Sequence, residues 1–257
     1  MTHFVQTLIS GLSLGSIYAL IALGYTMVYG IAKMLNFAHG DIIMVGAYAV
    51  IVSVFSLGMP PVVAILISVA VCALLGMLIE RLPDKPLRHA APLAVLITAI
   101  GVSYLLQNVA LLIFGSEQKA FPTLFEIPSL HFGEVIVDGI TLMTLAVTAV
   151  IMIGLTLFIN KTRMGKAMRA VSEDKEAAGL MGISTNHTIT VTFAIGSALA
   201  AVASIFYGAT YIYVKPTTGA MPGIKAFTAA VFGGIGSIPG AMLGGIVLGL
   251  IEQLSKA

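Results

Sequence analysis

The stretch IALGYTMVYGIAKMLNFAHGD, residues 21–41, decides how this chain folds, because a long apolar run gives way there to a cluster of polar residues. The run that leads into it, about residues 4–32, is long enough to cross a hydrocarbon core of roughly 30 Å. Asn36, His39 and Asp41 follow, and the aspartate alone would cost roughly 3 kcal/mol if it faced lipid. The sequence therefore predicts a helix junction at the inner edge of the membrane, where Asp41 caps the next helix without being buried.

The composition of the whole chain points to a membrane protein. Of 257 residues, 58% are hydrophobic and only 9% charged, and the mean hydropathy is +1.04, which leaves too little polar surface for a water-soluble globule. We expect one transmembrane domain over residues 1–257, an all-α polytopic helix bundle with interrupted (broken or re-entrant) helices. The apolar runs that would supply its helices are residues 4–32, 42–57, 60–80, 92–114, 139–159, 188–214 and 224–254.

The distribution of basic residues predicts the orientation in the membrane. Of the 13 Lys and Arg residues, 8 fall in the segments 81–88 and 161–175. Loops on the cytoplasmic side carry the excess of Lys and Arg, so both segments are expected there. Residues 116–138 then form an external loop, and the N-terminus lies outside. The basic residues are few and lie against the membrane, so nucleic acid is excluded as a ligand.

The longest hydrophilic segment is KTRMGKAMRAVSEDKEAAGLMGISTN, residues 161–186, and it predicts two short helices. Ser172 is suited to cap the second helix, with Glu173 and Asp174 in its first turn and Gly182 beyond its end. The second helix carries a small apolar face of Ala177, Ala178, Leu180 and Met181. Two interpretations remain open: a partner protein grips this helix, or it lies on lipid headgroups.

The last apolar run contains GGIGSIPGAMLGG, residues 233–245. Gly236, Gly240 and Gly244 recur every four residues, a spacing that lets two helices approach closely, and Pro239 prevents a continuous helix. For these three glycines and for Gly233, close helix packing and a place in a transport pathway are equal alternatives.

The sequence carries no phosphate-binding GxxxxGK[ST] loop, no GxSxG and no HExxH, so it is not expected to hydrolyse ATP or to act as an enzyme. No His, Cys or carboxylate stands at metal-ligand spacing beside His39, and the single Cys72 excludes an internal disulfide. A passive channel, or an intramembrane enzyme that uses His39 with Ser13 or Ser16, are competing hypotheses.

Three ordered motifs show a resemblance to a known family. SGLSLGSIYALIALGYTMVYGI followed by LNFAHGD, then AVSEDKEAAGLMGI, then GIKAFTAAVFGGIGSIPGAMLGG resemble the LivH-type permease subunits of bacterial ABC importers for branched-chain amino acids, over nearly the whole chain. The Glu-Ala-Ala followed by Gly of the family's coupling loop corresponds to Glu176, Ala177, Ala178 and Gly179. Family members usually continue with a further hydrophobic segment, whereas this sequence ends at IEQLSKA, which leaves the number of spans open.

The resemblance implies a transport subunit in the bacterial cytoplasmic (inner) membrane that moves leucine, isoleucine or valine. It implies a LivM-like second permease, two ABC ATPase subunits that bind the ATP, an external amino-acid-binding protein, contact with membrane lipid, and no cofactor in this chain. A permease for urea or short amides is the alternative within the family, against which Phe37 leans slightly. The expected ATPase-coupling residues are Arg169, Ser172, Glu173, Asp174, Glu176, Ala177, Ala178, Gly179 and Gly182. The expected pathway or helix-junction residues are Asn36, Phe37, His39, Asp41, Gly233, Gly236, Pro239 and Gly240.

Overall fold

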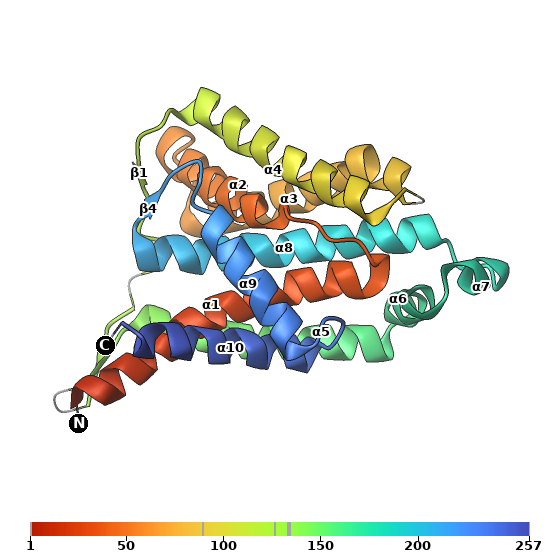
Figure 1. The fold of residues 1–257 in the computed structure, drawn as a ribbon. Coiled ribbons are helices and arrows are strands. Elements are labelled where there is room, and N and C mark those ends of the chain that lie inside the picture. The colour runs from red at the N-terminus through yellow and green to blue at the C-terminus, as the bar shows by residue number, and fades with distance from the viewer. Residues whose placement is uncertain (1, 89, 126, 133–134, 257) are drawn as a thin grey trace.

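The computed structural model describes residues 2–88, 90–125, 127–132 and 135–256, and these form a bundle of helices (Figure 1). Within the described residues, six helical segments are long and apolar enough to cross a membrane, which confirms the predicted polytopic all-α bundle. They are Phe4–Ala32, His39–Ser56, Pro61–Leu87, Pro92–Phe114, Gly139–Lys161 and Thr185–Tyr211.

The helices follow one another along the chain, with one long connection, residues 115–138, between α4 and α5, and their bounds are as follows. They are α1 (Thr2–Ala32), α2 (His39–Ile51), η1 (Val52–Ser56), α3 (Pro61–Ile79), η2 (Glu80–Asp84), η3 (Lys85–Leu87), α4 (Pro92–Phe114), α5 (Gly139–Lys161), α6 (Arg163–Glu173), α7 (Lys175–Leu180), α8 (Thr185–Tyr211), α9 (Ala220–Gly233) and α10 (Ile238–Leu254). Helices α3 and α4 begin with a proline, which fits a first turn because its missing N–H would have no partner there.

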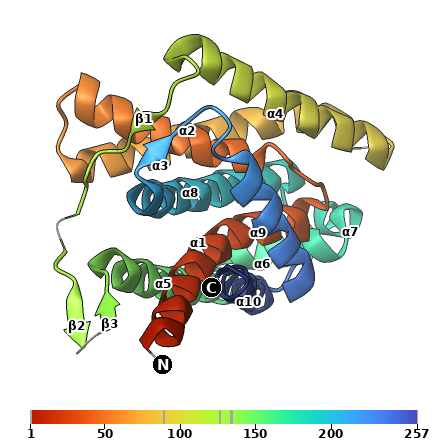
Figure 2. The same cartoon turned by 60° about the vertical axis from the view of Figure 1, so that its left-hand side comes forward.

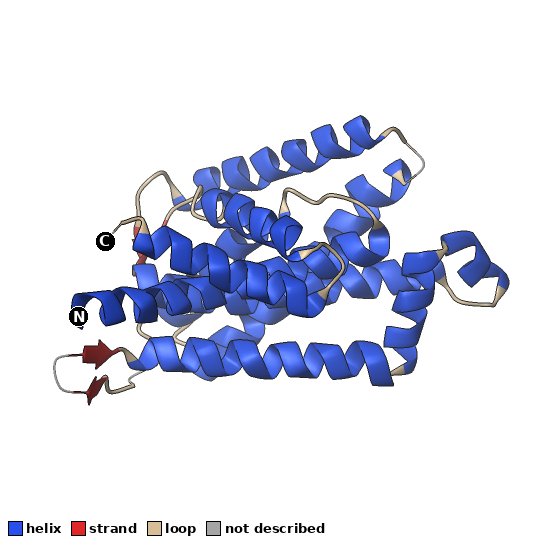
Figure 3. Cartoon of the chain, turned by 60° about the horizontal axis from the view of Figure 1, so that its bottom comes forward, coloured by secondary structure: helices blue, strands red, loops and turns tan. Residues whose placement is uncertain are grey.

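The two ends of the bundle differ in content. Both termini lie at one end together with four short strands, whereas α6 and α7 project from the opposite end (Figures 1 and 3). Strand β1 (Lys119–Ala120) pairs antiparallel with β4 (Tyr213–Val214), and β2 (Leu130–Phe132) pairs antiparallel with β3 (Val135–Val137). We call the end with α6, α7 and the segment 81–88 the basic end.

Helix α1 forms the centre of the bundle and packs against α10, α8, α9 and α5 (Figure 2). The closest of these contacts runs along α10, where glycines on both helices leave no room for side chains. A Cβ atom on Gly15 would meet the backbone of Ile246, and one on Gly245 would meet the backbone of Ala19. The spacing of small residues thus produces close helix packing, as small-residue motifs do in membranes.

The last apolar run, 224–254, does not cross as one helix. Helix α9 ends at Gly233, and Gly234 and Gly236 adopt φ angles of 90° and 97°, which glycine reaches without strain. Pro239 lies in the first turn of α10, where Ser237 accepts a hydrogen bond from the Gly240 N–H at 3.2 Å. The predicted interruption is confirmed, and α9 and α10 form a hairpin that brings the chain back to the end with the termini (Figure 1).

Helices α3, α4 and α5 lie at the periphery. In the most apolar stretch of α4, only 11% of the residues are buried inside the chain, whereas the corresponding share for α1 is 72%. Most exposed side chains of α4, among them Leu105, Leu112 and Ile113, are apolar. These helices therefore present the faces that a membrane-spanning bundle turns toward lipid or toward another membrane subunit.

Candidate functional site

The segment 33–38 turns back into the bundle. Helix α1 ends at Ala32, Lys33 adopts the left-handed conformation (φ 58°), and α2 begins only at His39. The imidazole of His39 lies against Gly24, where any Cβ atom would overlap it. Gly24 precedes the end of α1 by eight residues, or about 12 Å of helix. Helix α2 therefore starts well inside the bundle.

The structure corrects the expectation that Asp41 caps the next helix without being buried. Asp41 is 1% exposed, and it does not cap α2, whose N-cap residue is Ala38 without a side-chain hydrogen bond. Its carboxylate instead accepts hydrogen bonds from Ser103 and from Gln107 (2.9 Å) on α4. A carboxylate in the first turn of a helix is also favoured by the helix dipole, so three influences offset the cost of its burial.

The start of α9 crosses the start of α2 at the same depth. Cβ atoms on Gly219 or Gly223 would overlap the backbone of Gly40, so the two helices touch backbone to backbone. The Tyr25 hydroxyl packs beside this crossing, 3.4 Å from where a Cβ atom on Gly223 would lie. The NFAHGD motif and the C-terminal GIKAF motif, far apart in sequence, thus build one junction.

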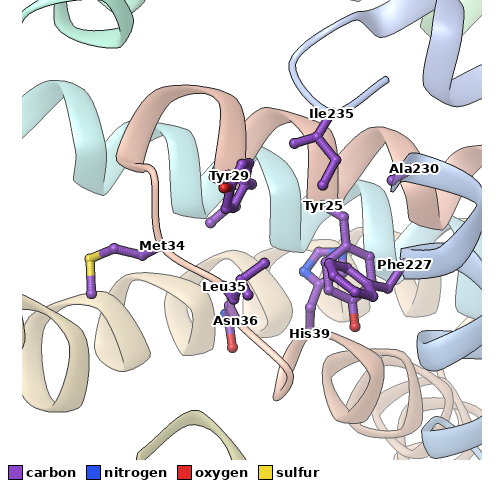
Figure 4. Close-up of a pocket in the computed structure, with 10 residues that line it drawn as sticks. Tyr25, Tyr29, Met34, Leu35, Asn36, His39, Phe227, Ala230 and Ile235 are labelled. Carbon is purple, nitrogen blue, oxygen red and sulfur yellow. The ribbon is translucent and has the colours of Figure 1, made fainter. Parts of the chain in front are cut away.

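A small cavity lies beside this junction, between α1, the segment 33–38 and α9 (Figure 4). Neither amide atom of Asn36 has a hydrogen-bond partner among the described residues, although this side chain is only 4% exposed. The Nε2 atom of His39 lacks a partner there too. Aromatic rings surround both: Tyr25 and His39 lie 4.6 Å apart between ring centroids, and Phe37 and Phe227 lie 5.3 Å apart.

Unpaired buried amide groups are uncommon, because leaving one unsatisfied costs about 1–3 kcal/mol. The cavity therefore combines apolar walls with hydrogen-bonding groups that the chain itself leaves unused. In this conformation the cavity has room for a group about the size of one water molecule, so a larger polar molecule reaches these groups only when the helices move apart.

The glycines of the α9–α10 turn fill a packing role. Gly233 and Gly240 face each other so closely that a Cβ on either would meet the other's carbonyl oxygen. Gly236 lies next to Gly30 of α1. The structure thus supports close packing at these positions.

The structure also brings two sets of predicted residues together at the basic end. Gly236 and Pro239 line a cavity of about 330 Å³ whose other walls include Arg169 and Ser172 of α6. Helix α6, which belongs to the hydrophilic segment 161–186, therefore lies directly beside the turn between α9 and α10.

The hydrophilic segment forms two short helices, as predicted, with a different cap. Ser172 belongs to α6, as does Glu173 at its end, and the Ser172 hydroxyl donates to the Arg169 carbonyl at 2.7 Å. Asp174 caps α7 instead, because its carboxylate accepts the N–H groups of Glu176 (2.8 Å) and Ala177 (3.0 Å). The prediction of Ser172 as N-cap was wrong.

The second helix exposes most of its surface. Leu180 and Met181 are 89% and 82% exposed, whereas Ala178 is buried against the bundle. Glu176, Ala177 and Gly179 are also exposed. Gly182 adopts φ 81°, which confirms it as the left-handed residue beyond the helix end.

Sequence reasoning missed several polar contacts that tie the basic end together. Glu80 forms an ion pair with Arg88, and Glu80 also accepts a hydrogen bond from Thr190 of α8 at 2.7 Å. The Lys175 ammonium donates to the Ala32 carbonyl at 2.7 Å. Ser103 was missed as a partner of Asp41, although its spacing of four residues from Gln107 places both on one face of α4.

The structure does not bring His39 together with either serine of the enzyme hypothesis. Ser16 donates to the Leu12 carbonyl at 2.8 Å, and Ser13 accepts from Thr141 at 3.2 Å. Among the described residues, no group of three His, Cys, Asp or Glu side chains could hold a metal ion.

Comparison with known proteins agrees with this architecture. Residues 7–257 match the family described as branched-chain amino acid transport system / permease component. The chain is 46% identical over 263 residues to the high-affinity branched-chain amino acid transport system permease protein BraD of Pseudomonas aeruginosa, covering 97% of this chain and 85% of the relative.

Two further relatives have similar names. Identity to the permease protein LivH of Escherichia coli is 44% over 273 residues, covering 99% of this chain and 87% of the relative. Identity to a probable branched-chain amino acid transport permease protein LivH of Methanocaldococcus jannaschii is 32% over 251 residues, covering 93% and 77%. No solved structure matches. The chain belongs to the family of permease components of branched-chain amino acid transport systems, and it is a multi-pass membrane protein.

Proposed function

We propose that this chain is the membrane-spanning permease subunit of an ATP-driven importer that translocates leucine, isoleucine and valine. The observation that carries the proposal is helix α7, which projects from the basic end and leaves Leu180 and Met181 almost fully exposed. Large apolar side chains exposed outside the membrane are typical of a surface that another protein covers. The names of the relatives support the substrate class and argue against urea or short amides.

The proposed assembly contains this subunit, a LivM-like second permease, two ABC ATPase subunits and an external amino-acid-binding protein. It lies in the cytoplasmic (inner) membrane with the basic end inside and the N-terminus outside, as the excess of Lys and Arg in segments 81–88 and 161–175 favours. The ATPase subunits bind and hydrolyse ATP, and this chain carries no cofactor of its own.

We place the substrate pathway beside the junction of α2 and α9. Asn36 and His39 offer hydrogen-bonding groups without partners among the described residues, and Phe37 with Phe227 offers apolar walls. An amino acid that passes this point can use both kinds of group. The turn at Gly233, Gly236, Pro239 and Gly240 lets the hairpin end move against α6 when the ATPase subunits close. The transport step is then a movement of packed helices around a fixed set of contacts.

Uptake of labelled leucine into proteoliposomes tests this function. The vesicles hold this chain with its candidate partners and binding protein, with or without ATP on the ATPase side. Uptake that requires both ATP and binding protein, and that isoleucine but not urea competes, supports the proposal. Leucine flux without either would instead indicate a channel, and ATP-driven flux of urea alone would overturn the substrate class.

Substitutions on α7 test the coupling surface separately. A Cβ at Gly179 meets no atom of this chain within 4 Å, so Gly179→Leu leaves its own fold intact. We expect Gly179→Leu and Glu176→Lys to reduce association of the ATPase subunits at least tenfold, with an unchanged melting temperature of the isolated permease. If both variants bind the ATPase normally and remain on the membrane, α7 is a headgroup helix and not the docking surface.

A further inference from the structure

Helix α7 is attached to the membrane helices through one residue at its start. The Lys175 ammonium donates a hydrogen bond of 2.7 Å to the carbonyl of Ala32 on α1, and the Lys175 carbonyl accepts from the Thr185 hydroxyl on α8 at 3.5 Å. The exposed half of α7, with Leu180 and Met181, lies at the other end of this short helix. Lys175 thus links the exposed helix to two spans at once.

The carbonyl that accepts this hydrogen bond lies at the C-terminal end of a helix. Ala32 is the last residue of α1, and the last carbonyl groups of a helix lack partners within the helix. The left-handed Lys33 then turns the chain away from the helix axis. A cation at this position satisfies a carbonyl and complements the negative end of the helix dipole.

The position is unfavourable for a lysine in every other respect. The side chain is half-buried, and burial together with the positive charges of Arg88 and Lys33 lowers the pKa of Lys175 below its usual value. A lysine that served only to keep the segment soluble would point into water. The ammonium is therefore held at this place by its bond to Ala32.

The Ala32 carbonyl, which accepts this hydrogen bond, directly precedes the segment that lines the candidate pathway. The segment 33–38 starts at the next residue and carries Asn36, whose amide has no partner among the described residues, to the cavity beside His39. This segment is not helical, so a displacement of its first residue changes the placement of the rest more readily than it would in a helix. A pull on Ala32 thus reaches Asn36 through four residues of chain, 33–36.

We propose that Lys175 is a positioning residue that transmits movement of α7 to the segment 33–38 and so couples ATP use to opening of the pathway at Asn36. The inference rests on the proposed function, since it requires an ATPase that docks on α7. Removal of the ammonium leaves α7 able to dock while its movement no longer reaches the segment 33–38.

The test compares three variants in the reconstituted importer with binding protein. Lys175→Met keeps the length and apolar stem but removes the donor, Lys175→Arg keeps a cationic donor, and Lys166→Met removes an exposed lysine of the neighbouring helix as a control. The measured quantity is leucine imported per ATP hydrolysed. We expect at least a fivefold fall for Lys175→Met, a value within twofold of wild type for Lys175→Arg, and no change for Lys166→Met.

Hydrogen exchange of the 33–38 amides gives a second readout that a merely structural role would not move. In the wild-type complex, ATP should change the exchange rates in this segment, and in Lys175→Met the change should vanish while assembly and basal ATPase activity persist. An unchanged leucine-to-ATP ratio in Lys175→Met, or loss of ATPase binding by it, would overturn the inference. A wild-type complex that imports no leucine with ATP and binding protein would overturn the proposed function instead.

Discussion

Helix α1 makes two contacts that differ in how closely the backbones approach and in whether the buried polar groups have hydrogen-bond partners. Against α10, its glycines remove all space between the backbones, and the Glu252 carboxylate near that contact receives hydrogen bonds from Tyr18, Lys225 and Lys256. Toward α2, the chain leaves helical structure and the buried amide of Asn36 has no partner among the described residues. The first contact is closely packed around a hydrogen-bonded carboxylate and suits a rigid framework, whereas the second keeps unused groups and suits a site that another molecule completes.

The largest expected effect breaks the framework. Gly15→Leu drives a side chain into the backbone of Ile246, which close packing cannot absorb. We expect at least a tenfold loss of folded protein in detergent extracts, measured by size-exclusion chromatography. Gly154→Leu on α5 is the matched control, since a Cβ there meets nothing within 4 Å, and normal yield is expected. Equal losses for both would mean that the α1–α10 contact is not special.

A smaller effect is expected where the junction is anchored to α4. Asp41→Ala leaves the donors of Ser103 and Gln107 without their acceptor, and each buried unsatisfied group costs about 1–3 kcal/mol. The melting temperature of the permease should fall, while Asp41→Asn, which keeps an acceptor oxygen, should lower it less. Identical melting temperatures for all three proteins would show that α4 is held by its apolar contacts alone.

The orientation of the two ends of the bundle across the membrane can be tested with substitutions that disturb the protein little. Ser129 directly precedes β2 and Ser172 lies in α6, two elements at opposite ends of the bundle (Figure 3), and native Cys72 is fully buried. A membrane-impermeant thiol reagent applied to intact cells should label Ser129→Cys and spare Ser172→Cys, with the wild-type chain unlabelled as the control. The reverse pattern would place the basic end outside and invert the proposed orientation.

Local signals in the sequence were sufficient for the helices and their interruptions. Hydropathy predicts the spans, and the glycines with Pro239 predict the break between α9 and α10, because each effect acts within a few residues. The N-cap of α7 was missed for a related reason: Ser172 and Asp174 are both good caps two residues apart, and their choice depends on where α6 ends.

The depth of the junction could not be predicted from local signals. It depends on Gly24, Gly40 and Gly219, which come from three separate parts of the chain and leave room for the imidazole and for a backbone crossing. The polar partners of Asp41 lie more than 60 residues away on α4, as the separations of 62 and 66 residues show. Positions in the sequence give no direct sign of such contacts.

The central claim, that the Asn36 side chain serves transport and not folding, is tested most directly by Asn36→Leu with two measurements on the same preparation. Since the amide has no partner among the described residues, its replacement should leave the melting temperature unchanged or raise it. ATP-dependent leucine uptake should fall at least tenfold, whereas Asn108→Leu on exposed α4 should change neither. A fall in melting temperature with uptake unchanged per folded transporter would contradict the account, because Asn36 would then be part of the framework.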